Sequence, residues 1–432
     1  MTGCSKLVSR HRHQTTRRQF LCRALGGAVG AAAARRLVGQ NPPLTVTRPP
    51  VRWESRLVAK IPEGYQVAVA DVNGDGRPDI LALSSGDNIV VWYQNPSWES
   101  HPITTATHAN IALAPLFKAG YPAQGVALAS DFDLRHTDLG GNIWWGMPGT
   151  SPNAQWTLSF ISSIPTSHRL RWADLDGRGQ LELVDAPLVG AGATPPDYDI
   201  GAPITWFRMP GGFLTPHASS QEERNAVWFP HLIDDALTVV HGLLPMDWNG
   251  DGRDELLTAS FEGVSLLEST GDLPNLDWSR VHLASGDQTT GPRRGASEIG
   301  VGTVAGRRFF ATIEPWHGNQ VVVYTMPPGD SSGVIWDRHV IDDSFRSGHA
   351  LVCGDLDQDG NDEIVAGYRG PGTSLYLFRA VDSSALRWER QLLDNEMGAS
   401  CAVLADLNGD GRLDIVAIGS STGNVKWYEN LG

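Results

Sequence analysis

The chain has 432 residues, 19% of them charged, and its formal net charge is −14. An acidic surface repels phosphate-rich polymers, which argues against nucleic acid and anionic lipid as partners and favours cations or neutral carbohydrate. The sequence contains 48 glycines, 27 prolines and 15 tryptophans, and its short apolar runs are rich in β-branched and aromatic residues. This composition indicates an all-β chain.

Residues 1–39 have the features of a twin-arginine export signal. Arg17 and Arg18 precede a short alanine- and glycine-rich stretch. That stretch is too short to cross a bilayer comfortably, so we expect no stable membrane span after the signal is removed. Cleavage near Ala34 would remove six of the 34 Lys and Arg residues, leaving 28 against 48 acidic residues and a net charge of −20. We expect an exported protein, periplasmic or extracellular; the alternative is a disordered basic arm.

Seven short strands that each open on a tryptophan recur along the rest of the chain. A unit that repeats roughly every 45 to 70 residues is typical of propellers and solenoids, because one such unit cannot bury its own apolar face. Each unit also ends on an apolar strand such as VVWYQNP or VKWYENL. The tryptophans are Trp53, Trp98, Trp156, Trp228, Trp278, Trp336 and Trp388.

The order of these segments predicts how the array closes. The strand that begins at Trp53 precedes every acidic loop, whereas the last unit ends at VKWYENLG without a tryptophan strand after it. If the N-terminal strand completes the last blade, no sheet edge is left open. We therefore predict a seven-bladed β-propeller over residues 50–432, with a straight solenoid as the alternative.

Four acidic, glycine-rich loops place oxygen ligands at alternate positions, as hard divalent cations require. They are DVNGDGRPD, DWNGDGRDE, DLDQDGNDE and DLNGDGRLD. The predicted calcium ligands are Asp71, Asn73, Asp75 and Asp79; Asp247, Asn249, Asp251 and Glu255; Asp355, Asp357, Asp359 and Glu363; and Asp406, Asn408, Asp410 and Asp414. The twelfth positions lack the Glu of an EF-hand, so we expect calcium in loops between strands, where it stabilises the blade.

Two other segments resemble damaged copies of these loops. In ADLDGRGQLEL, Arg178 stands where the third acidic ligand would be, and DFDLRHTDLGG keeps only Asp131 and Asp133. The fifth unit has no acidic loop. We expect that these blades hold no calcium.

Histidines occupy one repeated position, six residues before an acidic loop. His168, His241 and His349 lie there in the third, fourth and sixth units, and Glu298 lies at about the same place in the fifth. The other units offer Tyr65, Gly125 and Ser400. In a propeller this position begins the innermost strand, so the side chains are predicted to ring one mouth of the central channel. The alternative is that the histidines only hydrogen-bond neighbouring blades.

Three imidazoles and a carboxylate on consecutive blades suit zinc or another divalent transition metal. The fifth unit also contains EPWHGN, whose loop we expect over the same mouth. There His317 would act as acid or base and Trp316 as a platform for a sugar ring.

The acidic loops resemble those of the FG-GAP or VCBS repeat family, whose members are calcium-containing propellers of many functions. The segments SHRLRWADLDG, HGLLPMDWNGDG, IEPWHGNQVVVY and GHALVCGDLDQDG also resemble the propeller domains of the aldos-2-ulose dehydratase family. That resemblance implies dehydration of keto-sugars with a metal in the propeller. Because the sequence ends after the predicted propeller, we expect dehydration without the isomerisation that other domains of that family perform.

Together these patterns predict an exported, metal-dependent carbohydrate lyase, a hydro-lyase that acts on a keto- or anhydro-sugar. It would abstract an α-proton and eliminate a β-hydroxyl. We assign His241, Glu298 and His349 to the transition metal, and His168 and His317 to proton transfer. The competing hypotheses are a non-catalytic, calcium-stabilised propeller that binds glycans or proteins, and a hydrolase.

Overall fold

The computed structural model describes residues 51–118, 124–151, 154–211, 227–328 and 334–432 of the chain. The chain divides into two units, Met1–Gln40 and Asn41–Gly432. The export signal predicted at residues 1–39 lies outside the described residues and stays a prediction. Across the described ranges, no helix is long and apolar enough to cross a membrane.

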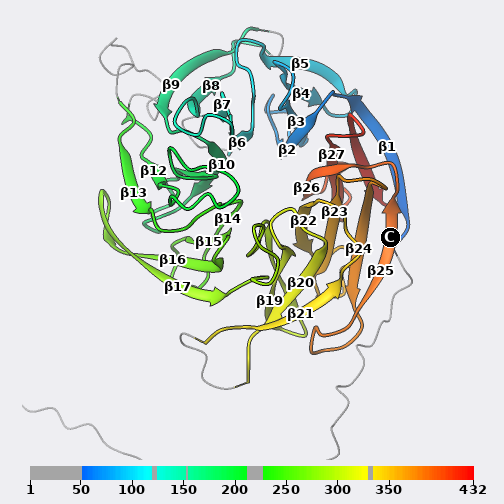
Figure 1. Ribbon diagram of the computed structural model, residues 1–432. Helices are drawn as coiled ribbons and strands as arrows, with labels where there is room; N and C mark the ends of the chain where they lie inside the picture. The colour runs from blue at the N-terminus through cyan, green and yellow to red at the C-terminus, as the bar shows by residue number, and fades with distance from the viewer. Residues whose placement is uncertain (1–50, 119–123, 152–153, 212–226, 329–333) are drawn as a thin grey trace, which may run out of the picture. The chain divides into compact units, whose positions relative to one another are not determined.

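The second unit is a seven-bladed β-propeller, as the sequence predicts. Its strands form seven four-stranded antiparallel sheets. Figure 1 shows the sheets arranged around a common centre, with one strand of each sheet near the centre and one at the rim. The tryptophan strands are the rim strands, and the strands predicted to end each unit lie third from the centre.

The strands are grouped by their position in the blade. The inner strands are β2 (Gly64–Ala70), β6 (Ala112–Leu116), β10 (Ser167–Ala173), β14 (Gly242–Met246), β18 (Ile299–Val304), β22 (Gly348–Gly354) and β26 (Ala399–Ala405). The second strands are β3 (Asp79–Ser84), β7 (Gly125–Ser130), β11 (Glu182–Pro187), β15 (Glu255–Ser260), β19 (Arg307–Glu314), β23 (Glu363–Tyr368) and β27 (Asp414–Gly419).

The outer half of each blade completes the sheet. The third strands are β4 (Val90–Gln94), β8 (Asn142–Met147), β12 (Ile204–Phe207), β16 (Gly263–Asp272), β20 (Gln320–Thr325), β24 (Ser374–Ala380) and β28 (Asn424–Asn430). The rim strands are β5 (Glu99–Thr104), β9 (Thr157–Ser163), β13 (Pro230–Asp234), β17 (Asn275–Ala284), β21 (Asp337–Asp342), β25 (Trp388–Asp394) and β1 (Trp53–Lys60).

The N-terminal strand closes the last blade, which confirms the predicted topology. β1 pairs antiparallel with β28 from Trp53 opposite Asn430 to Lys60 opposite Asn424. Figure 1 accordingly shows the blue β1 beside the C-terminal strands. The pairing leaves no strand edge open at the junction of the two chain ends.

Burial follows position in the blade. The second strands β3, β15 and β27 are buried at every residue, whereas the rim strand β25 is exposed or half-buried throughout. Packing of the blades against one another therefore forms the hydrophobic core. One cluster, for example, joins Val67 and Ile80 of the first blade to Val416 and Ile418 of the seventh.

The seven blades share two ends, which we name by their contents. The inner strands begin at the histidine end, where His168 and His349 lie, and finish at the acidic-loop end. In the blades with intact loops, the acidic loop joins the inner strand to the second strand, so acidic loops and histidines lie at opposite ends of the inner strands.

The second blade departs from the prediction. Gly125 was expected to begin the inner strand, but it begins the second strand β7, and β6 is the inner strand. The segment that starts at Asp131 is consequently the β7–β8 connection at the histidine end and is no copy of the acidic loops. In the observed register Ile111 has the place in the second blade that His241 has in the fourth, because the Ile111 amide donates to the Ala129 carbonyl just as the His241 amide donates to the Ala259 carbonyl.

Neighbouring blades are also joined by buried asparagines. Asn430 Nδ2 donates to the Leu356 carbonyl at 2.7 Å and to the Leu413 carbonyl at 3.0 Å. Its side chain is fully buried, so Asn430→Ala would leave both carbonyls without this donor. We expect a loss of about 2 kcal/mol in the free energy of unfolding, measured by urea titration. The exposed turn variant Asn88→Ala, between β3 and β4, should change it little, and equal effects of the two variants would contradict this role.

Candidate functional site at the histidine end

A β-bulge at the start of four inner strands aims side chains into the channel mouth. Pairing between inner and second strands skips one residue in the first, third, sixth and seventh blades. The skipped residues are Tyr65, His168, His349 and Ser400. Because bulges commonly redirect a side chain next to a site, they give a physical reason for the repeated position found in the sequence.

The turns that precede the residues around the channel mouth also share a backbone conformation. The residue two positions earlier has a positive φ in five blades: Glu63, Ala109, Thr166, Val239 and Ser347. Val239, with φ 48°, is β-branched, and such residues rarely adopt this conformation. His317 has φ 50° in its own loop. Backbone strain of this kind is concentrated at functional sites, where the surrounding fold holds it.

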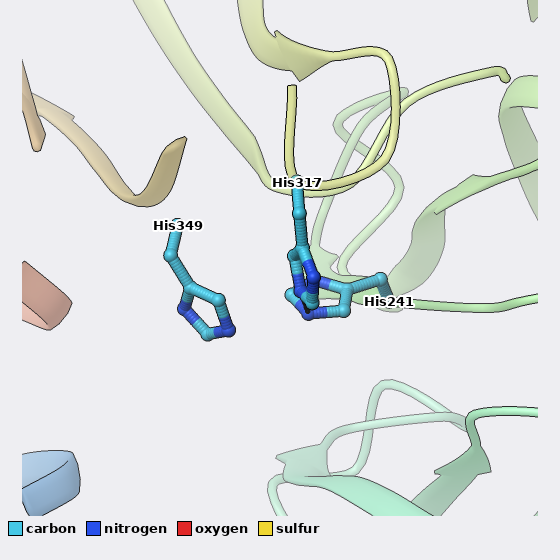
Figure 2. A group of neighbouring side chains, drawn as sticks. All are labelled: His241, His317 and His349. Atoms are coloured by element: carbon cyan, nitrogen blue, oxygen red, sulfur yellow. Dashed lines mark hydrogen bonds between the residues drawn. The ribbon is translucent and has the colours of Figure 1, made fainter. Parts of the chain in front are cut away.

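Three imidazoles meet at the centre of the mouth. His241 lies directly before β14, His349 on β22, and His317 in the β19–β20 loop, and one nitrogen of each lies within 4.8 Å of the others. His241 Nε2 and His317 Nε2 are 2.9 Å apart. Figure 2 shows the rings of His241 and His317 against each other, with that of His349 facing them. We call these three residues the imidazole group.

A second pair lies directly beside the imidazole group. The Tyr65 hydroxyl lies 2.8 Å from His168 Nε2 and 3.3 Å from His349 Nε2. The rings of His168 and His241 are 4.7 Å apart between centroids. Tyr65 therefore links the predicted proton-transfer residue His168 to the imidazole group.

Glu298 does not join the imidazole group. Its Oε1 accepts from Arg169 Nη2 at 2.6 Å and lies 3.1 Å from His241 Nδ1. Burial alone would raise the pKa of Glu298, but Arg169 and His241 outweigh it and the pKa lies below its ordinary value. The carboxylate thus orients His241 from behind, and His317, not Glu298, lies together with His241 and His349.

The histidines at this mouth are held in the neutral form. Burial, followed by the charge of Arg169, lowers the pKa of His241 to about 4. The pKa values of His168, His317 and His349 are also well below the ordinary value, first because of burial. Neutral imidazoles keep the lone pair that a metal ligand or a general base needs.

The hydrogen bonds test whether a transition metal fits. Because the carbonyl oxygens of Ser297 and Ser400 can only accept, His241 Nδ1 and His349 Nδ1 carry protons toward them, at 3.1 and 2.6 Å. Their Nε2 lone pairs therefore face the mouth. Two nitrogens on a tetrahedral zinc lie about 3.3 Å apart, so the 2.9 Å separation between His241 and His317 is near the required value. The three residues fit such an ion.

A cavity inside the channel reaches the mouth at Tyr65 and His349, whereas His168, His241 and His317 are not among its lining residues. Its volume is about 480 Å³, and all seven inner strands line it. Tyr65, Arg169, Glu298, His349 and Ser400 contribute its polar lining near the mouth, and Ala, Val and Leu side chains supply most of the rest. A space of this size accommodates a small sugar.

At the acidic-loop end the four predicted calcium loops share one geometry. The first Asp accepts the amides of the fifth and sixth residues, as Asp71 does from Asp75 and Gly76 at 3.0 and 2.9 Å. The sixth residue is a glycine with positive φ in every loop: Gly76, Gly252, Gly360 and Gly411. Oxygens of Asp355, Asp357 and Asp359 lie within 4.8 Å of one another. This donor set suits a hard cation.

The ninth residue of each of these loops is a buried acid. Asp79, Glu255, Glu363 and Asp414 are at most 3% exposed, and each accepts the amide of the second loop residue. Burial raises the pKa of Asp79 to about 6 and that of Glu363 to about 8. In the damaged loop, the Arg178 guanidinium lies 2.9 Å from Asp272 and 3.6 Å from Asp176.

Two features of the histidine end could not be assigned from the sequence. Arg369, directly after β23, places Nη2 3.4 Å from His317 Nδ1, and no repeated motif marks its position. The sequence placed Tyr65 at the repeated position before an acidic loop but did not assign it a function. Trp316 stacks on His317 with centroids 4.7 Å apart, which occupies one face of the predicted sugar platform.

Comparison with known proteins gives three kinds of match. Residues 140–327 match the aldos-2-ulose dehydratase β-propeller domain, residues 355–417 an FG-GAP-like repeat, and residues 64–89 an FG-GAP repeat. Aldos-2-ulose dehydratase of Phanerodontia chrysosporium is 24% identical over 384 residues, which are 83% of this chain and 40% of that protein. The chain thus spans less than half the length of this relative.

One solved structure is matched at low sequence identity. It is an Agrocybe aegerita lectin that recognises non-reducing terminal N-acetylglucosamine, with 12% identity, 86% of each chain covered and a TM-score of 0.46. The family matches confirm the resemblance expected from the acidic loops and the histidine segments. The chain carries FG-GAP repeats and is similar to the β-propeller domain of aldos-2-ulose dehydratase.

Proposed function

We propose that this protein is a metal-dependent carbohydrate lyase that removes water from a keto- or anhydro-sugar. The observation that carries the proposal is the meeting of the imidazole group with the Tyr65–His168 pair at the mouth of a sugar-sized cavity. The similarity to a sugar dehydratase over 83% of the chain supports the same reaction class.

In this proposal His241, His317 and His349 hold a divalent transition metal such as zinc. When bound, that ion supplies Lewis-acid stabilisation of the negative charge that develops on a carbonyl oxygen. Glu298 supports the site by accepting from His241 Nδ1, the kind of outer contact that fixes the tautomer of a metal ligand. This assignment replaces Glu298 by His317 among the ligands expected from the sequence.

Proton transfer falls to His168 and Tyr65. The neutral His168 imidazole accepts the α-proton as the carbon–hydrogen bond breaks and a carbon–carbon double bond forms. The bond to the β-hydroxyl then breaks, and the Tyr65 hydroxyl donates a proton so that the group leaves as water. His168 returns its proton to Tyr65 through their 2.8 Å hydrogen bond, which balances the cycle.

Calcium has a separate role in the proposal. We infer that the four acidic loops bind Ca²⁺ to stabilise their blades, far along the inner strands from the reaction. Export through the twin-arginine signal of residues 1–39 also belongs to the proposal, because that segment has the required arginine pair.

Turnover of a panel of keto-sugars and anhydro-sugars tests the reaction. We expect ultraviolet absorbance of an unsaturated carbonyl product, with a product mass lower by one water. Tyr65→Phe, which keeps the ring and removes the hydroxyl, should lower kcat by about 100-fold. Tyr198→Phe, outside this hydrogen-bond network, should retain activity. A product that gains water would indicate a hydrolase, and sugar binding without turnover would indicate a glycan-binding propeller.

A further inference from the structure

Four arginines at the histidine end have no carboxylate partner. Arg293 and Arg294 lie in the β17–β18 connection, Arg346 in the β21–β22 connection, and Arg369 directly after β23. None of them takes part in an ion pair within the described ranges. In a chain with 48 acidic and 34 basic residues, guanidiniums without a carboxylate partner gathered at one mouth indicate a site for an anion.

Arg369 is the one that reaches the imidazole group. Its amide donates to the Ser347 carbonyl at 3.1 Å, which fixes the backbone beside His349. Its guanidinium lies 3.4 Å from His317 Nδ1. Burial, with Arg169 and Arg293 nearby, lowers the pKa of Arg369 below its ordinary value, although the group stays charged.

The two central arginines differ in how their charge is balanced. Arg169 lies inside the channel and is paired with Glu298 at 2.6 Å. Arg369 has only the neutral His317 ring as a side-chain partner in the described part of the chain. A half-buried cation without an anionic partner is unfavourable, and an anionic ligand relieves this.

The contact that holds Arg369 is weak, and the proposed metal would remove it. The guanidinium can only donate, so His317 Nδ1 must accept, at a distance near the outer limit for a hydrogen bond. If His317 Nε2 binds a metal ion, the proton of the ring lies on Nδ1 instead. Nδ1–H then faces a second donor, and Arg369 is free to turn toward the substrate.

We infer that the histidine end recognises an acid group on its sugar substrate and that Arg369 is the residue that binds it. The preferred substrate class is therefore a sugar acid, with its carboxylate held by the fork of the guanidinium and Arg293 nearby. This inference rests on the proposed lyase function and narrows its substrate. A phosphate group has related chemistry and is distinguished by the test below.

Isothermal titration calorimetry on the full chain as purified tests this recognition without turnover. The probes are D-glucuronate, D-glucose 6-phosphate and the neutral D-glucose. We expect at least one of the two anionic sugars to bind about tenfold more tightly than D-glucose, which corresponds to about 1.4 kcal/mol. Tighter binding of D-glucuronate identifies a carboxylate site, whereas preference for D-glucose 6-phosphate overturns the sugar-acid class and leaves a phosphate site.

Arg369→Gln should abolish the preference for the anionic sugar, and Arg369→Lys should retain part of it. The matched control is Arg307→Gln, an exposed arginine where β18 turns into β19 at the acidic-loop end. Absence of any anion preference, or its persistence in a folded Arg369→Gln protein, overturns the inference. Dehydration of neutral keto-sugars by a protein without anion preference would leave the proposed lyase intact, so the two failures are distinguishable.

Discussion

Replacing His241 by alanine is expected to remove a tightly bound transition-metal ion, about one per chain, together with lyase activity. His241 lies at the centre of the mouth, 2.9 Å from His317 Nε2 and with its ring centroid 4.8 Å from that of His349. Changing even an outer contact of a metal ligand commonly lowers affinity by about 10- to 100-fold, and removal of a ligand should exceed this. Metal content after dialysis in calcium-containing buffer measures the effect.

Several variants make this result specific. His241 is fully buried, so His241→Gln, which keeps much of the volume, separates loss of the ligand from a packing defect. His349→Ala should lose the metal as well. His282→Ala, on the exposed rim strand β17, should retain both metal and activity. Unchanged transition-metal content in His241→Ala and His349→Ala would contradict the proposed metal site.

The fold was predictable because each blade repeats the same physical requirements. A tryptophan lies in each rim strand or within two residues before it, and an apolar third strand follows each second strand, so the blades could be counted and the closure by β1 predicted. The second blade was the exception. Its segment from Asp131 resembles an acidic loop in composition, but it follows the second strand, so Gly125 was assigned to the wrong strand.

The site was only partly predictable, since a repeated offset locates strand starts but not loops. The bulges that present His168 and His349 occur at that offset. His317 and Arg369 come from connections after the second strands, which differ in length from blade to blade. Their position near His241 depends on how the fifth and sixth blades pack at the mouth, and no local sequence pattern predicts that packing.

The four acidic loops lead to a prediction in which calcium and pH act together. The folded pKa of Glu363, about 8, lies above its ordinary value of 4.5, and that of Asp79, about 6, lies above 3.8. Between roughly pH 4.5 and 8 the calcium-free folded protein thus binds more protons than the unfolded chain, so its stability falls as pH rises. Bound Ca²⁺ would favour the ionised carboxylates and reverse this loss.

We therefore expect chelation of calcium to lower the melting temperature far more at pH 8 than at pH 5. With four sites near saturation, the decrease at pH 8 should be on the order of 10 °C. Glu363→Gln should remove about a quarter of the calcium effect and should make the calcium-free protein more stable at pH 8. The exposed rim variant Glu389→Gln should change neither quantity. Equal melting temperatures at pH 8 with Ca²⁺ and with chelator would contradict calcium binding, because ionised carboxylates packed this closely should respond to a cation that neutralises them.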